Sequence, residues 1–179
     1  MRKTLEAGFT LLELLIVVAI IGIIAAIAVP GLLRARIAGN EASAIGSLRS
    51  INSANSTFSS SCGGNGYAID LAILTLPPVG SNAAFISPDL NVNGVTKSGY
   101  IVNLSNDQAG VVVTVAAATC NMAADAMSAY FAEAHPVTIG STGQRSFGTD
   151  VRGTIYFKND GTPVAQAEMV VGGAASVLQ

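Results

Sequence analysis

An acidic residue, Glu13, lies four positions inside an otherwise apolar stretch near the N-terminus. A charged side chain at the centre of a bilayer costs roughly 2.5–3.5 kcal/mol on insertion scales, and somewhat less near an interface. Ionisable residues in membrane segments are therefore rare and mark functional sites. Glu13 is the first candidate for a functional residue.

Cys62 and Cys120 are the two cysteines of the chain. An even pair outside the cytoplasm favours one disulfide, which the loop-entropy treatment makes stabilising by roughly 4 kcal/mol for a loop of this length. Two unpaired thiols are the alternative. The spacing does not match a CxxC redox motif, and a single histidine cannot complete a usual zinc site with these cysteines.

The single histidine, His135, follows a candidate strand, and no nucleophile or orienting acid is marked for it. We interpret His135 as a surface or strand-end residue. Asp150 and Asp160 have the oxygen ligands of a calcium site, but no calcium-loop signature surrounds them, and turn or surface roles fit better. No phosphate-binding glycine loop is present. The sequence therefore predicts no enzyme, no catalytic residue, no cofactor and no metal site.

The element that positions Glu13 is a long apolar segment. Residues 14–33 contain no charged side chain, and as a helix at about 1.5 Å per residue they match a hydrocarbon core of about 30 Å. The basic residues Arg2 and Lys3 precede the segment and favour a cytoplasmic N-terminus, whereas Arg34 and Arg36 at the other end leave the orientation open.

The segment Gly8-Phe9-Thr10-Leu11-Leu12-Glu13 resembles the class III signal motif of type IV prepilins and of type II secretion pseudopilins. A short basic leader, the Gly–Phe junction, the acid and the apolar run coincide, and a plain membrane anchor would not need them in register. The resemblance implies that prepilin peptidase cuts between Gly8 and Phe9 and methylates Phe9. Glu13 is then the fifth residue of the mature chain, where the family carries its acid.

A charge pair is the chemistry that this register makes possible. In one straight helix Phe9 lies about 6 Å along the axis from Glu13. A neighbouring subunit shifted by a comparable step would bring its Glu13 to the new amino terminus, among apolar helices where an unpaired carboxylate is costly. Cleavage would thus couple processing to filament assembly.

Gly22 and Pro30 fall where members of the family often carry helix-loosening residues. Proline removes one helical hydrogen bond, and glycine costs about 1 kcal/mol relative to alanine. Two readings stay open for this segment: it unwinds partly in the filament, or it holds a fixed kink.

Three functions follow, in this order. The first is a structural subunit of a surface type IV pilus for adhesion, motility or uptake, and the second is a pseudopilin of a type II secretion system. The third is a membrane-anchored periplasmic binding protein or enzyme that does not polymerise. The expected partners are identical or related subunits, prepilin peptidase, the bacterial inner membrane and the pilus assembly machinery. The precursor would lie in the inner membrane and the mature chain in a surface pilus or periplasmic pseudopilus.

Beyond Pro30 the helical pattern continues to about Phe58. An apolar stripe recurs at three-, four- and seven-residue steps and predicts packing on a globular head. Its members are Leu33, Ile37, Ala44, Leu48, Ile51 and Phe58. Glu41 falls within the stripe, either at its edge or paired with an arginine of the same or a neighbouring subunit.

The head is predicted as antiparallel strands after the helix, which makes the fold class α+β and pilin-like. A short helix is expected at 70–74, a turn near 88–90 and a brief helix at 122–127. Candidate strands are 99–104, 110–115, 129–133 and 153–158, and Asn159-Asp160-Gly161 predicts a hairpin into a strand at 162–165. The expected domains are a cleaved leader at 1–8, a transmembrane and assembly helix at 9–33, an amphipathic helix half at 34–60 and the head at 61–179.

Composition limits the partners of the chain. Half of the residues are hydrophobic, 11% are charged and the formal net charge is −2. Binders of nucleic acid usually carry a basic patch, so no specific nucleic acid is predicted.

Overall fold

The computed structural model describes residues 9–170 and 173–178 of the 179-residue chain. They fall into two compact units, one reaching Arg36 and the other, called the head here, beginning at Ile37. The predicted leader at 1–8, with Gly8 at the expected cleavage site, lies outside the described residues.

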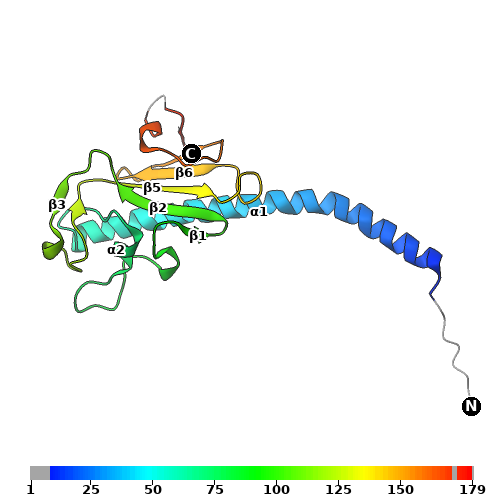
Figure 1. The fold of residues 1–179 in the computed structure, drawn as a ribbon, viewed down its shortest axis with the longest axis horizontal. Coiled ribbons are helices and arrows are strands. Elements are labelled where there is room, and N and C mark those ends of the chain that lie inside the picture. The colour runs from blue at the N-terminus through cyan, green and yellow to red at the C-terminus, as the bar shows by residue number, and fades with distance from the viewer. Residues whose placement is uncertain (1–8, 171–172, 179) are drawn as a thin grey trace, which may run out of the picture. The chain divides into compact units, whose positions relative to one another are not determined.

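One helix, α1 (Leu11–Ser61), belongs to both units and continues through Gly22 and Pro30 (Figure 1). It begins two residues later and ends three residues later than the sequence predicts. At its end the amides of Cys62 and Gly63 both donate to the carbonyl of Phe58. Gly64 then takes a φ of 55°, a left-handed conformation that favours glycine and ends a helix.

A six-stranded antiparallel sheet follows, in the order β1-β2-β5-β6-β7-β8. A separate two-stranded sheet pairs β3 with β4. The bounds of the strands are β1 (Val95–Lys97), β2 (Tyr100–Asn106), β3 (Val112–Thr114), β4 (Ala126–Met127), β5 (Tyr130–Pro136), β6 (Ser146–Asp150), β7 (Ile155–Lys158) and β8 (Ser176–Val177). The short helix α2 (Leu71–Thr75) and three 3-10 turns, η1 (Pro88–Leu90), η2 (Ala116–Ala118) and η3 (Gln166–Glu168), complete the fold. The predicted α+β class is confirmed.

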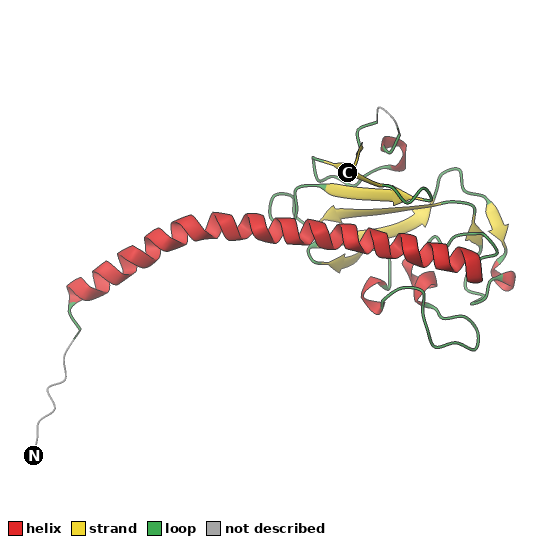
Figure 2. Cartoon of the chain, turned by 180° about the vertical axis from the view of Figure 1, so that it is seen from behind, coloured by secondary structure: helices red, strands yellow, loops and turns green. Residues whose placement is uncertain are grey.

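The core of the head lies between the second half of α1 and one face of the large sheet (Figure 2). The predicted stripe supplies the helix side of this core from Ala44 onward, with Leu48, Ile51 and Phe58 fully buried. The prediction is wrong for Leu33, which is 43% exposed and precedes the head. The sheet side comes from alternate residues of its strands, which point to the same face. They include Tyr100, Val102, Leu104, Ala132, Ala134 and Phe147.

The other face of the sheet is partly covered by the chain after β7. Val164 and Met169 pack against Tyr156 there and form a second apolar cluster. Gly148 on β6 lies under both, and a Cβ at Gly148 would come within 3.0 Å of each side chain.

Two predictions in the head are wrong. The segment expected as a helix at 122–127 instead ends in β4, where Met127 exchanges backbone hydrogen bonds with Tyr67. Residues 162–165 do not pair with β7, whose second partner is β8. Asp160 accepts hydrogen bonds from the amide and hydroxyl of Thr162, which holds the chain in a local turn, and Val164 packs in the second cluster instead.

Candidate functional site

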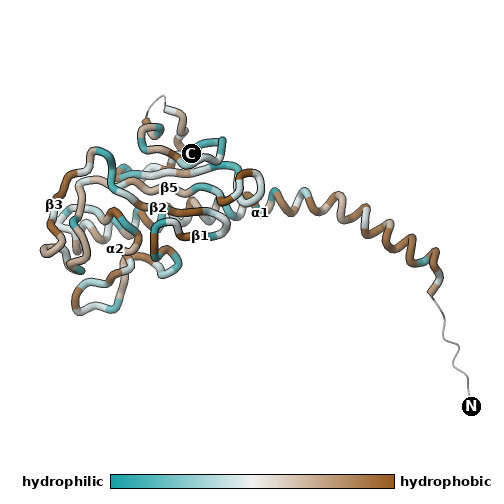
Figure 3. Tube along the Cα trace, in the orientation of Figure 1, coloured by the Kyte–Doolittle hydropathy of each residue, from teal (hydrophilic) through white to brown (hydrophobic). Residues whose placement is uncertain are grey.

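The first half of α1 presents an exposed apolar surface. It contains a window of 18 residues with a mean hydropathy of 3.0, none of it buried in the isolated chain, long and apolar enough to cross a membrane. Figure 3 shows the apolar colour along this stretch. Such a surface needs lipid or neighbouring helices to cover it.

Glu13 helps to cap the N-terminus of this helix through hydrogen bonds with Thr10. The Thr10 hydroxyl accepts a hydrogen bond from the amide of Glu13 at 3.2 Å, and Oε2 of Glu13 accepts from the amide of Thr10 at 2.9 Å. The hydroxyl of Thr10 also donates to Oε2 at 2.7 Å. This reciprocal arrangement is a capping box, which satisfies amides that have no partner within the helix.

The capping box changes the predicted geometry around Phe9. Because α1 begins at Leu11, Phe9 and Thr10 precede the helix, and the expected spacing of about 6 Å along one straight helix does not apply. All hydrogen bonds to the Glu13 carboxylate from described residues go to Oε2, which leaves Oε1 for another partner. The Thr-x-x-Glu spacing is a known capping signature, and sequence reasoning overlooked it.

Gly22 and Pro30 both lie inside the continuous α1. A Cβ built at Gly22 has no atom within 4 Å, so no close contact among the described residues requires a glycine at this position. The proline has no amide to donate, so the helix lacks one hydrogen bond at Pro30.

Glu41 is buried on α1 and pairs with Arg145, in the loop before β6 (side chains 9% and 35% exposed). Its Oε2 accepts from Nε and Nη2 of Arg145 at 2.9 and 2.7 Å. Its Oε1 accepts from the amides of Gln144 and Arg145, both at 3.1 Å. The partner is thus in the same chain, one of the two arrangements that the sequence left open for Glu41.

The loop that carries Arg145 is held at further points. Tyr100 donates its hydroxyl to the carbonyl of Arg145 at 2.7 Å, and burial raises the pKa of Tyr100, with the nearby Glu41 carboxylate adding to the rise. A Cβ at Gly143 would collide with the Tyr100 hydroxyl. Asn40 donates to the carbonyl of Thr142 at 2.8 Å. These contacts fix the loop on α1.

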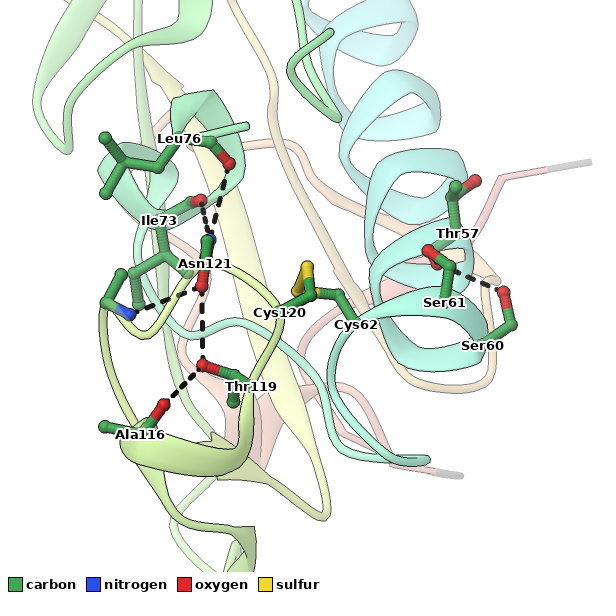
Figure 4. The surroundings of a disulfide bond; sticks show 11 residues. Thr57, Ser60, Ser61, Cys62, Ile73, Leu76, Ala116, Thr119, Cys120 and Asn121 are labelled. Carbon is green, nitrogen blue, oxygen red and sulfur yellow. Dashed lines mark hydrogen bonds between the residues drawn. A yellow bond between two sulfur atoms is a disulfide. The ribbon is translucent and has the colours of Figure 1, made fainter. Parts of the chain in front are cut away.

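Cys62 and Cys120 form a disulfide with their Cα atoms 4.6 Å apart (Figure 4). The amide of Cys120 also donates to the carbonyl of Cys62 at 3.2 Å. Asn121 extends the connection, since its Nδ2 donates to the carbonyls of Ile73 and Leu76 around α2. The end of α1, the η2 segment and α2 are therefore tied together.

The other titratable candidates are engaged in local pairs. His135 Nδ1 lies 2.9 Å from Oε2 of Glu133, which stands two residues earlier on β5. Asp150 accepts from Nε and Nη2 of Arg152, and Asp160 lies 3.5 Å from Lys158 Nζ. Within residues 9–170 and 173–178, no group of three or more His, Cys, Asp or Glu side chains is placed to hold a metal ion.

Comparison with known proteins adds one result. The family described as "Prokaryotic N-terminal methylation motif" matches residues 3–29. No curated protein and no solved structure matches the chain. The matched range contains Gly8, Phe9, Glu13 and Gly22, and Pro30 follows it directly.

Proposed function

Because the chain is a type IV pilin- or pseudopilin-like precursor, we propose that it is a structural subunit of a surface type IV pilus. The observation that carries the proposal is the position of Glu13, the one acid in the exposed apolar first half of α1, inside the matched motif. Prepilin peptidase cuts between Gly8 and Phe9 and methylates Phe9. The mature chain then polymerises through α1 and acts without catalysis, in adhesion, motility or uptake.

Oε1 of Glu13 accepts no hydrogen bond from the described residues, and this supports the assembly role. Thr10 occupies only Oε2, so the carboxylate can cap its own helix and still accept a hydrogen bond from the methylated amino group of a neighbour. A charge-assisted hydrogen bond of this kind is about twice as strong as a neutral one, and more so among apolar helices.

An intact-mass spectrum of sheared surface material and of the membrane fraction tests the proposal. We expect a methylated chain that begins at Phe9 in the sheared material. The same processed chain confined to membranes would instead favour a secretion pseudopilin, which carries the same type of motif. Full-length protein that retains Met1 to Gly8, in cells with active prepilin peptidase, would contradict both. A Gly8→Val variant is the control for uncut precursor.

The Gly22–Pro30 segment gives the filament a place to extend. We propose that this part of α1, continuous in the isolated chain, unwinds partly after assembly, because it already lacks one hydrogen bond at Pro30. A reconstruction of the filament should show non-helical backbone between these two residues. Continuous helix in that reconstruction would rule out the unwinding, and the alternative of a fixed kink would then hold.

A further inference from the structure

An exposed apolar edge lies at the end of the head where α1 finishes (Figure 1). Four valines in and beside β3 keep at least 44% of their surface exposed, namely Val111, Val112, Val113 and Val115. One edge of β3 pairs with β4, and no other strand in the described part of the chain pairs with its second edge. An apolar strand with a free edge is a surface for another chain.

Two carboxylates flank the uncharged stretch that contains this valine edge, and Asp125 is the exposed one. The other, Asp107, is half-buried, and its Oδ1 accepts from the amide of Ala109. Residues 108–124 contain no charged side chain, and Asp125 follows them directly. Its Oδ1 accepts a hydrogen bond from the amide of Ala116 at 2.7 Å, which holds it beside the segment after β3. Asp125 is exposed and makes no ion pair with any described residue.

A single spare cation exists elsewhere in the head. Four of its five basic residues are in ion pairs, namely Lys97, Arg145, Arg152 and Lys158. The fifth, Arg49, is exposed on α1 and has no acidic partner among the described residues. Exposed Ala42, Gly46 and Ser53 lie on the same side of α1 as Arg49. Because these side chains are small, another chain can approach the backbone of α1 closely here.

The two spare charges form no ion pair within one copy among the described residues. The chain next to Asp125 is held beside the last turns of α1, because Met127 pairs with Tyr67 and the next residue, Ala68, exchanges hydrogen bonds with Asn55. Arg49 lies about 9 Å before Asn55 along α1, at 1.5 Å per residue.

We propose that the valine edge binds α1 of a second copy, with Arg49 of that copy paired to Asp125. The opposite charges of Arg49 and Asp125 favour a second copy as the partner. The valines then pack on the small side chains of its α1. The two surfaces differ, so the contact is heterologous and repeats into an open chain rather than closing as a dimer. The proposal rests on the proposed filament function and names one contact within it.

Engineered cysteines test the contact in whole cells. Because the described residues hold no free cysteine, a short bismaleimide reacts only with introduced thiols. The double variant R49C/D125C should give a ladder of dimers, trimers and longer species, whereas each single variant should stay monomeric. The control R49C/D160C places the second thiol at another exposed acid and should give no ladder.

The outcomes separate this contact from the filament itself. If wild-type chain is recovered in sheared filaments but R49C/D125C stays monomeric, the contact is wrong and the pilus proposal stands. A ladder without sheared filaments upholds the contact and overturns the surface pilus. Dimers from R49C alone would contradict the heterologous contact.

Charge reversal gives an independent readout. R49E and D125K should each lower the yield of sheared filament about tenfold, because each places like charges together. The combined R49E/D125K variant should restore the yield to within about twofold of wild type, since the pair is then reversed. Equal losses in single and combined variants would overturn the pairing.

Discussion

Glu41 and Arg145, 104 positions apart in the sequence, form a bidentate ion pair that joins α1 to the loop before β6. Two backbone amides complete the hydrogen bonds to the carboxylate. Arg145 also lies 5.6 Å from the centre of the Phe147 ring and 5.4 Å from that of Phe157, which positions its guanidinium from the other side. The loop before β6 thus donates four hydrogen bonds to the buried Glu41 carboxylate.

Replacing Glu41 by Gln should destabilise the head strongly. The variant keeps the shape of the side chain but removes the charge from the hydrogen bonds to Arg145, and hydrogen bonds to charged groups contribute about 1.5–3 kcal/mol. Urea unfolding of the detergent-solubilised full chain, followed by near-ultraviolet circular dichroism, measures the free energy of unfolding.

The control is the pair Lys97–Asp89, whose Nζ and Oδ2 lie 2.6 Å apart and whose acid is 48% exposed, against 9% for Glu41. Lys97→Met should cost less than about 1 kcal/mol, because exposed ion pairs contribute little. Equal losses for Glu41→Gln and Lys97→Met would show that Glu41 matters no more than a surface charge.

The sequence predicts the helix more completely than the head, for a physical reason. The stripe of Leu48, Ile51 and Phe58 repeats with the helical period, so the buried face can be found without knowing what covers it. Glu41 could be located in that stripe but not matched to Arg145, because nothing local specifies a partner 104 positions away.

Short strands are harder to predict for a similar reason. β4 has two residues, and β6 carries Gly148 at its centre, which weakens a strand pattern. Gly148 stands there because Val164 and Met169 pack over it, a long-range contact. The capping box at Thr10 and Glu13 is different, since its spacing was readable from the sequence alone.

Removing the disulfide should lower the stability of the head. The variant Cys62→Ser/Cys120→Ser should lose roughly 4 kcal/mol in the loop-entropy treatment, because the unfolded chain is no longer crosslinked. Urea unfolding with and without reductant measures the change. Reductant should shift the wild-type midpoint and leave the variant unmoved, so a wild-type midpoint that ignores reductant would argue against a stabilising disulfide.

Acid should release the segment around η3. Lys158 Nζ lies 2.8 Å from Oε1 of Glu168, and this hydrogen bond, joined by that from the Ala165 amide, lowers the pKa of Glu168. A carboxyl with a lowered pKa contributes stability above its ordinary value near 4.3, and this stability is lost as the pH falls through the lowered pKa. The rate of hydrogen exchange at residues 164–169, corrected for intrinsic rates, should therefore increase as the pH is lowered below about 4.3.

The variant Glu168→Gln is the control for this pH dependence. It keeps an acceptor for Lys158 but has no group that titrates, so its exchange at 164–169 should vary less with pH in the same range. An unchanged pH profile in the variant would assign the release to other carboxyls, Asp160 first, since its pKa is also lowered, mainly by its hydrogen bond with Thr162.

Two substitutions at Glu13 separate its capping role from its charge. Glu13→Ala removes both, while Glu13→Gln keeps an oxygen that can accept from the amide of Thr10 and complete a capping box. If the charge serves assembly, both variants should insert, be cleaved after Gly8 and fail to appear in sheared filaments. Loss of the cap alone costs only about 1 kcal/mol of helix stability. Immunoblots of sheared and membrane fractions, with mass spectra for cleavage, provide the measurement. Wild-type filament yield from Glu13→Gln would mean that Glu13 acts as a helix cap, and that the neighbour's amino group needs no carboxylate at this position.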